Sequence, residues 1–193
     1  IRGIPDWMDG LDKRTDISIQ ERNIIKELDF PKPDFIIHAA SIASPIYYRK
    51  HPIETIEANV NGLQNLLNYS KNYPVESFLF FSTSEIYGNP DSSNIPTDEN
   101  YRGNVSCTGP RACYDESKRL GETLSVNYWK IHNVPVKIAR PFNNYGPGLK
   151  ITDKRVIPDF FNNVINNNDI SILSDGKSTR TFCYSSDAIE GYL

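Results

Sequence analysis

Cysteine is scarce in this sequence of 193 residues. The three cysteines, Cys107, Cys113 and Cys183, are an odd number, and their spacing matches no zinc-binding pattern. Disulfide frameworks are typical of small secreted domains, whereas reduced thiols are typical of the cytosol. The sequence therefore predicts reduced thiols in a cytoplasmic protein, and nothing in it indicates a metal site.

An excess of positive charge is also lacking. The 21 Lys and Arg residues are outnumbered by 24 Asp and Glu residues, which gives a formal net charge of −3 and a pI near 5.6. A domain that binds nucleic acid is usually basic, with Lys and Arg gathered on one face. We therefore do not expect nucleic acid as a partner.

Long hydrophobic runs are absent as well. No apolar run approaches the ~20 residues needed to span a bilayer, and the first five residues, IRGIP, lack the charged and hydrophobic regions of a signal peptide. We expect a soluble protein that does not meet a membrane. Because residue 1 is not methionine and residues 186–193 resemble a helix that has only begun, we also expect both ends of the chain to be cut.

The sequence does contain apolar strands that alternate with amphipathic helices. Short apolar runs at residues 34–40, 77–83 and 134–140 are typical of buried parallel strands. Apolar side chains recur at helical spacing over residues 52–72, and a second long helix is expected from about 110 to 132. Strands that alternate with long helices predict right-handed crossovers and a parallel sheet.

Residues 19–28 predict a short amphipathic helix ahead of the sheet. After the sheet, the alternation of apolar strands and long helices ends near residue 148. Beyond it the expected elements are a helix at 156–167, strands at 170–173 and 181–184, and a terminal helix. We therefore predict an α/β domain over residues 1–142 and a smaller α+β domain over residues 143–193.

Tyr114 and Lys118 are the strongest chemical signal. Their spacing of four places both side chains on one face of the predicted helix. A nearby ammonium favours a phenolate and lowers the tyrosine pKa from about 10, so Tyr114 is predicted to act as a base toward a hydroxyl that loses a hydride. The alternative is that the two residues have no catalytic role and lie on an ordinary helix surface, where the Tyr114 ring packs against the helix and the Lys118 side chain extends beside it.

Polar residues follow each predicted strand, at positions 38–41, 82–85 and 141–147. In open parallel sheets, ligands bind beyond the carboxyl ends of the strands. These three strand ends and the helix that carries Tyr114 are therefore predicted to converge on one cleft.

Four motifs, in order, resemble a known family. They are FSTSEIYG at 81–88, the Tyr114 and Lys118 pair, RPFNNYGP at 140–147 and DGKSTRTF at 175–182. They are similar to motifs of extended short-chain dehydrogenase/reductases, the NAD-dependent epimerase/dehydratase family, whose members act on nucleotide sugars. GPRACYDE at 109–116 resembles most the UDP-glucuronate decarboxylase branch. The resemblance implies a Rossmann-type doubly wound parallel sheet with a smaller α+β substrate domain.

The resemblance also implies NAD as cofactor and a role for each matching residue. Tyr114 would deprotonate the C4 hydroxyl of the sugar, and Thr83 would hydrogen-bond the same oxygen. Glu85, together with Ser84, would face the sugar near C5 and C6. Substrate contacts are also implied for Asn143, at a phosphate, and for Arg180, at the diphosphate or carboxylate. The residues that would line the NAD cleft are His38, Ala39, Ala40, Asn59, Ser82, Tyr114, Lys118 and Pro141.

Several of these residues have a structural alternative. A threonine at a strand end is often a cap, Glu85 can be a surface residue, and Arg180 can pair with any neighbouring carboxylate. Asn59 can lie on a helix exterior, and a structural role suits His38 better than a catalytic one.

The implied reaction is a decarboxylation. Oxidation at C4 would turn a glucuronate into a β-keto acid, which loses carbon dioxide, and return of the hydride would give the xylose nucleotide. Dehydratases of the family typically carry aspartate where this chain has Ser84, and its epimerases usually lack Glu85, so both activities are disfavoured. The alternatives kept are a 4,6-dehydratase or 4-epimerase, a non-catalytic nucleotide-sugar-binding relative, and an interaction module. The resemblance further implies a homodimer through the two long helices.

The sequence lacks the G-x-x-G-x-x-G pattern whose loop cradles a dinucleotide pyrophosphate. We expect the complete protein to begin about fifty residues earlier, where dinucleotide folds place this loop. By this prediction the chain alone binds NAD poorly and is inactive.

Overall fold

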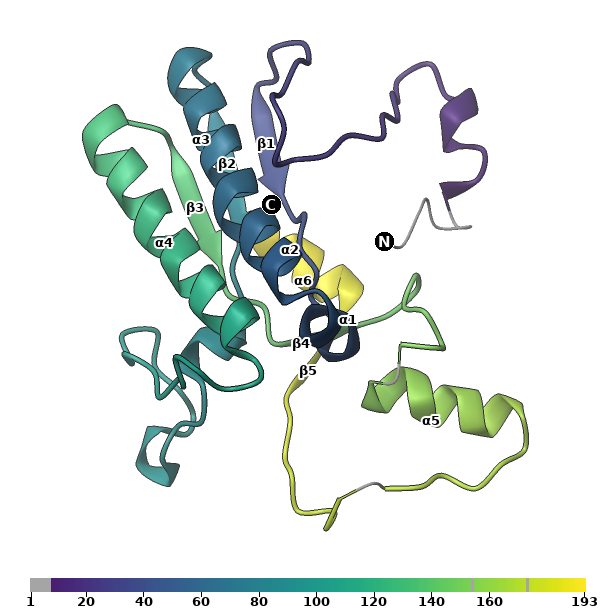
Figure 1. Ribbon diagram of the computed structural model, residues 1–193. Coiled ribbons are helices and arrows are strands. Elements are labelled where there is room, and N and C mark those ends of the chain that lie inside the picture. Colours follow the sequence, from purple (N-terminus) through teal and green to yellow (C-terminus); the bar gives the residue numbers. More distant parts are fainter. Residues whose placement is uncertain (1–7, 154, 173) are drawn as a thin grey trace. The chain divides into compact units, whose positions relative to one another are not determined.

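A computed structural model describes residues 8–153, 155–172 and 174–193 (Figure 1). Contacts within the chain group them into two compact units. One unit is continuous, Asn23–Phe142, and contains the sheet with its long helices. The other is built from the residues on either side of it in the sequence.

The sheet of the continuous unit has three parallel strands in the order β1 (Phe35–His38), β2 (Ser77–Phe81) and β3 (Val136–Ala139). Phe35 lies opposite Ser77, and Phe78 lies opposite Val136. Each strand coincides with one of the predicted apolar runs. The predicted α/β fold with a parallel sheet is therefore confirmed.

The first crossover is helical. It consists of α1 (Pro45–Lys50), α2 (Pro52–Glu57), a π-helical turn (Ala58–Gly62) and α3 (Leu63–Asn72). The spacing over residues 52–72 predicted an uninterrupted helix, and the structure places a widened turn in its middle. Such π turns are frequent at functional sites.

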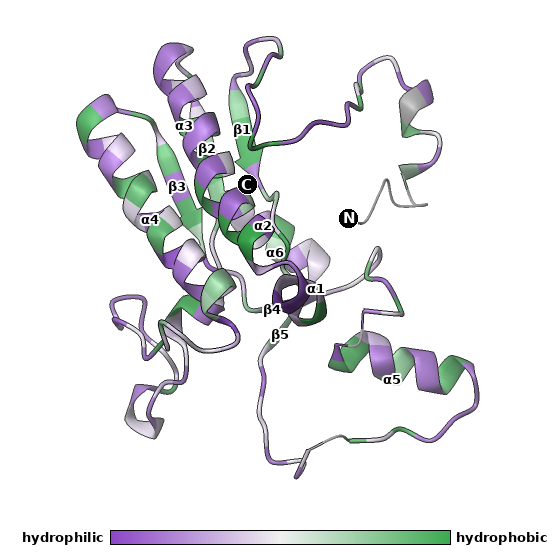
Figure 2. Cartoon of the chain, viewed as in Figure 1, coloured by the Kyte–Doolittle hydropathy of each residue, from purple (hydrophilic) through white to green (hydrophobic). Residues whose placement is uncertain are grey.

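The second crossover contains a short 3-10 helix at Ser84–Tyr87, another at Ser92–Asn94, and the long helix α4 (Ala112–His132). Figure 1 shows α3 and α4 side by side along the sheet, and the two helices contact each other. Along α4, hydrophobic and hydrophilic bands alternate in Figure 2, as expected for a helix with one buried face.

The core lies between the sheet and these helices. Its buried members are Ile36, Leu63, Leu66, Leu67, Val75, Phe78, Phe80 and Val134. Helix α4 approaches the sheet closely at Gly121, where an added Cβ would lie 2.7 Å from the ring of Phe80. On the opposite face of β1, Phe35 and Ile37 are 64% and 59% exposed.

The predicted helix over residues 19–28 is wrong. The structure shows an irregular segment with a short turn at residues 24–26. Ile24 packs against Gly62, and the Asn65 side-chain amide donates to the carbonyl oxygens of Ile24 and Lys26. The apolar residues therefore reach the core from a non-helical backbone whose polar groups Asn65 helps to satisfy.

The second unit contains a two-stranded parallel sheet of β4 (Asn143–Tyr145) and β5 (Phe182–Tyr184), with α5 (Val156–Ile165) and α6 (Ser185–Tyr192) and a 3-10 helix at Leu11–Lys13. The predicted strand over 170–173 is not formed at 170–172, and residue 173 lies outside the described residues. Strand β4 was not predicted, because its polar sequence lacks the apolar pattern of a strand. None of the described helices is long and apolar enough to cross a membrane.

Candidate active site

Tyr114 and Lys118 lie in the first turns of α4, on the face that meets the sheet. Both are buried, with 7% and 2% of their surface exposed. The Lys118 Nζ lies 5.9 Å from the centre of the Tyr114 ring and donates to the Phe81 carbonyl oxygen at 2.7 Å. The predicted placement of the two side chains on one helix face is thus what the structure shows.

Thr83 joins this pair from the end of β2. Its Oγ1 accepts a hydrogen bond from the Glu85 backbone N–H at 3.3 Å and so caps the short helix Ser84–Tyr87. A side-chain hydrogen bond with Tyr114 also lowers the pKa of that phenol. Thr83 therefore both caps the short helix and contacts the Tyr114 phenol.

The net pKa of Tyr114 is nevertheless raised. Burial is the largest cause, the charges of Glu85 and Asp115 and the Tyr48 phenol add to it, and Thr83 opposes it. Burial also lowers the pKa of Lys118 to about 8. The predicted lowering of the Tyr114 pKa by Lys118 is therefore wrong for this structure, because a buried site disfavours charge on both groups.

A cluster of charged and phenolic side chains borders Tyr114. The Arg111 Nη2 forms an ion pair with Glu85, and the Arg111 Nε lies 3.6 Å from the Asp115 carboxylate. The Tyr48 ring, from α1, stacks on that of Tyr114 with centroids 5.2 Å apart and planes 9° apart. Burial raises the pKa of Asp115 to about 6.

Three members of this cluster were not singled out from the sequence. Arg111 and Asp115 flank Tyr114 in the same motif, three residues before it and one after it, which was an available signal. Tyr48 lies 66 residues earlier in the chain, and no local pattern indicates that its ring would stack on Tyr114.

His38 ends β1 and is 2% exposed. Its ring stacks on Phe80 at 5.8 Å, and its two nitrogens have no hydrogen-bond partner in the described part of the chain. Burial, and then the charge of Lys118, lower its pKa to about 4. Ala39 and Ala40 follow it at the surface.

Asn59 is fully buried in the π turn and bridges two segments. Its Oδ1 accepts from the Ser41 hydroxyl at 2.6 Å, and its Nδ2 donates to the Ser117 Oγ at 2.8 Å. Ser117 in turn donates to the Tyr114 carbonyl oxygen at 2.9 Å. Asn59 therefore links the loop after β1 to the turn of α4 that carries Tyr114, and the helix-exterior alternative is wrong.

Two other residues implied at the cofactor cleft serve the local structure. The Ser82 hydroxyl donates to Glu122 at 2.6 Å, and Glu122 also pairs with Arg140 at 2.7 Å. The Pro141 carbonyl oxygen accepts from the Ser84 backbone N–H at 3.0 Å. These contacts fix the ends of β2 and β3.

Asn143 and Arg180 belong to the second unit. The Asn143 side-chain amide donates to the Thr181 carbonyl oxygen at 3.0 Å, so it supports the pairing of β4 with β5. Arg180 is exposed and donates to the Thr179 carbonyl oxygen at 2.7 Å.

The buried polar groups at the strand ends fit a polar cofactor. Both nitrogens of His38 lack a partner in the described structure, and Lys118 carries three N–H donors, one of which meets the Phe81 carbonyl oxygen. Buried polar groups are costly when unpaired. Ribose hydroxyls and a carboxamide offer both donors and acceptors, so the nicotinamide end of NAD matches these groups.

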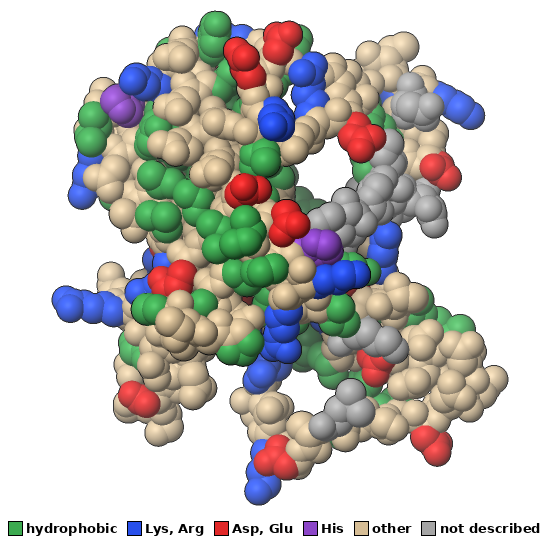
Figure 3. All heavy atoms as spheres, in the orientation of Figure 1, with side chains coloured by type: hydrophobic (Ala, Val, Ile, Leu, Met, Phe, Trp, Pro, Cys, Tyr) green, Lys and Arg blue, Asp and Glu red, His purple; other side chains and the backbone are tan. Residues whose placement is uncertain are grey.

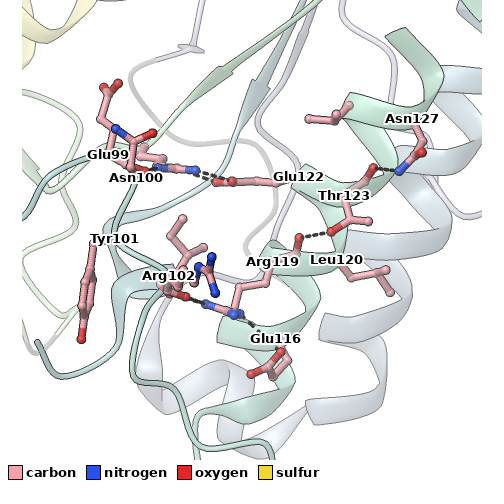
Figure 4. A pocket seen from close by; sticks show the side chains of 13 residues that line it. Glu99, Asn100, Tyr101, Arg102, Glu116, Arg119, Leu120, Glu122, Thr123 and Asn127 are labelled. Atoms are coloured by element: carbon pink, nitrogen blue, oxygen red, sulfur yellow. Dashed lines mark hydrogen bonds and ion pairs between the residues drawn. The ribbon is translucent and has the colours of Figure 1, made fainter. Parts of the chain in front are cut away.

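A cavity of about 680 Å³ lies elsewhere in the same unit, between residues 99–102 and α4 (Figure 4). Tyr114, Thr83 and Lys118 are not among its lining residues. Arg119 crosses it to the carbonyl oxygens of Ile86 and Arg102, at 2.9 and 2.8 Å. Among the described residues, no three His, Cys, Asp or Glu side chains are grouped so as to hold a metal ion.

Comparison with protein-family models matches residues 10–193 to the NAD dependent epimerase/dehydratase family. UDP-glucuronic acid decarboxylase 6 of Arabidopsis thaliana is 41% identical over 172 residues, which is 89% of this chain and 49% of the relative. UDP-glucuronic acid decarboxylase 1 of the same plant is 44% identical over 160 residues, 83% of this chain and 36% of the relative. The chain thus spans half or less of the length of these relatives.

Solved structures share the fold. UDP-glucose 4-epimerase from Thermotoga maritima, solved with UDP-glucose, superposes with a TM-score of 0.75 at 24% identity and covers 83% of this chain and 51% of its own. UDP-glucuronic acid 4-epimerase from Bacillus cereus, solved with UDP-glucuronic acid and NAD, superposes with a TM-score of 0.65 at 27% identity and covers 82% of this chain and 48% of its own. These likenesses confirm the predicted Rossmann-type fold.

Proposed function

Because this chain belongs to the NAD-dependent epimerase/dehydratase family, we propose that the protein is an NAD-dependent lyase that converts UDP-glucuronate to UDP-xylose with loss of carbon dioxide. The observation that carries the proposal is the buried group of Tyr114, Thr83 and Lys118 at the end of β2. The relatives named UDP-glucuronic acid decarboxylase, at 40–44% identity, support the substrate and the reaction.

Tyr114 acts on the oxygen at C4 of the sugar. It accepts the proton of the C4 hydroxyl when that carbon is oxidised, and the resulting neutral phenol then donates a hydrogen bond to the same oxygen. Negative charge develops on that oxygen as the carboxylate leaves, so a positioned donor lowers the barrier. The raised pKa of Tyr114 keeps the phenol protonated, which suits the donor step and disfavours the preceding base step.

The neighbouring residues position and tune this phenol. Thr83 shares the C4 oxygen with Tyr114, and Lys118 binds the nicotinamide ribose. Glu85, with Ser84, faces the sugar near C5 and C6. NAD, when bound, supplies the hydride acceptor for C4.

The remaining site residues belong to the same proposal. We assign the cofactor cleft to residues 1–142 and a substrate domain to residues 143–193, with Asn143 and Arg180 at the nucleotide or the sugar carboxylate. The cofactor side is lined by His38, Ala39, Ala40, Asn59, Ser82 and Pro141. The family name and a neighbour solved with NAD support this cofactor. The unpaired cysteines support a cytoplasmic location.

The test uses the complete protein that contains this chain, incubated with NAD and UDP-glucuronate. We expect release of carbon dioxide and formation of UDP-xylose. A Tyr114→Phe variant should lose at least about 100-fold in kcat, as expected for removal of an acid–base group, and its nicotinamide absorbance should stay unchanged on addition of substrate.

The matched control is Tyr128→Phe on the same helix, whose hydroxyl donates to Asn68 outside the site. It should keep its activity, and both variants should keep the circular dichroism of the wild type. Formation of a 4-epimer or a dehydrated sugar would assign the protein to another reaction of the family. Substrate binding with no turnover would indicate a binding relative.

A further inference from the structure

Arg111 lies between two carboxylates at the edge of the proposed site. Glu85, from the short helix after β2, pairs with the Arg111 Nη2. Asp115, one turn further along α4, faces the Arg111 Nε at 3.6 Å. The proposed function uses Glu85 at the substrate and gives no role to Asp115.

We propose that Asp115 is a positioning residue that holds the Arg111 guanidinium against Glu85 and thereby fixes the Glu85 carboxylate beside Tyr114. This inference rests on the proposed function. It concerns a group that acts through Arg111 and does not itself touch the substrate.

The burial of Asp115 indicates a role beyond packing. The residue is 6% exposed, and its Oδ1 has no hydrogen-bond partner in the described part of the chain. A buried carboxylate with an unpaired oxygen costs stability. At a helix position that needed only packing, an uncharged side chain of similar size would be more stable, so the charge is explained by its effect on Arg111.

Glu116, the next residue, provides the contrast. It pairs with the Arg119 Nε at 3.6 Å, the same separation as in the pair of Asp115 and Arg111. Its side chain is 37% exposed, and it lines the cavity of Figure 4, whose lining residues do not include Tyr114. The two acids thus form similar ion pairs on α4, and only one of these pairs continues to Glu85.

The charges around Asp115 determine how the site titrates. The groups that face it are Arg111, Glu116, Cys113 and Tyr114 from its own helix, Glu85 from the short helix after β2, and Tyr48 from α1. Its negative charge contributes to the raised pKa of Tyr114. Neutralising Asp115 should therefore lower the pKa of Tyr114 and shift the acidic limb of the kcat profile to lower pH.

The experiment is a double-mutant cycle of Asp115→Asn and Glu85→Gln in the complete protein. Asp115→Asn alone should lower kcat about tenfold, because a loosened Glu85 leaves the productive geometry, and KM should change less than about threefold. In the Glu85→Gln background the same substitution should cost less than about twofold, since residues that act through one group are not additive. Asp115→Glu, which keeps the charge, should recover most of the lost kcat.

The melting temperature at pH 7 distinguishes this role from a structural one, because loss of a stabilising residue would lower it. Asp115→Asn should raise the melting temperature, because it removes a poorly solvated charge. The control Glu116→Gln should leave kcat at pH 7 and the Glu85→Gln cycle unchanged.

A wild-type kcat for Asp115→Asn, an equal loss in both backgrounds, or a lowered melting temperature would each overturn the inference while leaving the proposed function intact. A wild-type protein that releases no carbon dioxide would instead remove the proposed function and this inference together.

Discussion

The charged amine of Lys118 is buried away from solvent. The side chain is 2% exposed, its amine donates to the Phe81 carbonyl oxygen, and burial lowers its pKa to about 8. The unfolded chain has the ordinary pKa near 10.5. Between these two values the unfolded state binds more protons, so stability rises with pH, and below about pH 8 the cost of the charge is fully present.

We therefore expect Lys118→Met to stabilise the fold at neutral pH. The difference between the two pKa values corresponds to an upper estimate of about 3 kcal/mol, and loss of the hydrogen bond to Phe81 offsets about 1 kcal/mol of it. Urea unfolding at pH 7 and at pH 10.5 measures the effect, which should shrink at the higher pH. Lys130→Met, at an exposed position of the same helix, should change little at either pH, and a less stable Lys118→Met at pH 7 would contradict the argument.

The spacing of Tyr114 and Lys118 was enough to predict that they share a helix face, and the strand-end position of Thr83 was enough to bring it near. The electrostatics of the site could not be predicted in the same way. The pKa of Tyr114 depends on burial and on Glu85, Asp115 and Tyr48. These effects arise only when distant segments pack together.

Gly121 determines how closely α4 approaches the sheet. An added Cβ would lie 2.7 Å from the Phe80 ring and 3.2 Å from the Leu63 side chain, both of which are fully buried. Because neither neighbour has free space, a larger residue must push the helix outward.

Gly121→Ala should therefore destabilise the protein by about 1–3 kcal/mol, the range for overpacked cores, despite the higher helix propensity of alanine. Chemical unfolding of the variant measures the loss. In α6, Gly191 has nothing within 4 Å of an added Cβ, so Gly191→Ala is the matched control and should be neutral or stabilising. Equal effects of the two substitutions would show that packing at Gly121 is not tight.

The helices and strands that have a regular spacing of apolar residues were predicted well. Segments whose conformation depends on contacts with distant parts of the chain were not. β1, β2, β3 and α4 coincide with their apolar patterns. The segment over 19–28 has helical spacing without a helix, because its apolar side chains pack against the core, as Ile24 does against Gly62, from an irregular backbone. β4 is polar and forms through its pairing with β5, which no local pattern encodes.

At the scale of the whole molecule, hydrophobic side chains gather on the surface over α2 and α4 (Figure 3). Exposed apolar residues on these helices include Ile53, Ile56, Leu120, Val126, Trp129 and Ile131. The proposed homodimer through the two long helices would bury this surface, since large exposed apolar patches commonly mark interfaces.

Leu120→Glu in the complete protein should then weaken the dimer by at least about thirtyfold, the effect of losing one strong interface contact. Sedimentation over a range of concentrations measures the dissociation constant. Ile165→Glu, at a more exposed site on α5, serves as control and should leave the association unchanged. A monomeric wild type would remove this proposal.

The π turn at Ala58–Gly62 changes the direction in which the side chains before it point around the helix axis. One extra residue in a helical turn rotates the preceding residues about the helix axis by roughly 100° relative to an ideal α-helix. Asn59, which hydrogen-bonds both Ser41 and Ser117, lies in this widened turn. The extra residue thus offsets the direction of α2 side chains from those of α3, so that α3 contributes Leu63, Leu66 and Leu67 to the core while α2 contacts α4.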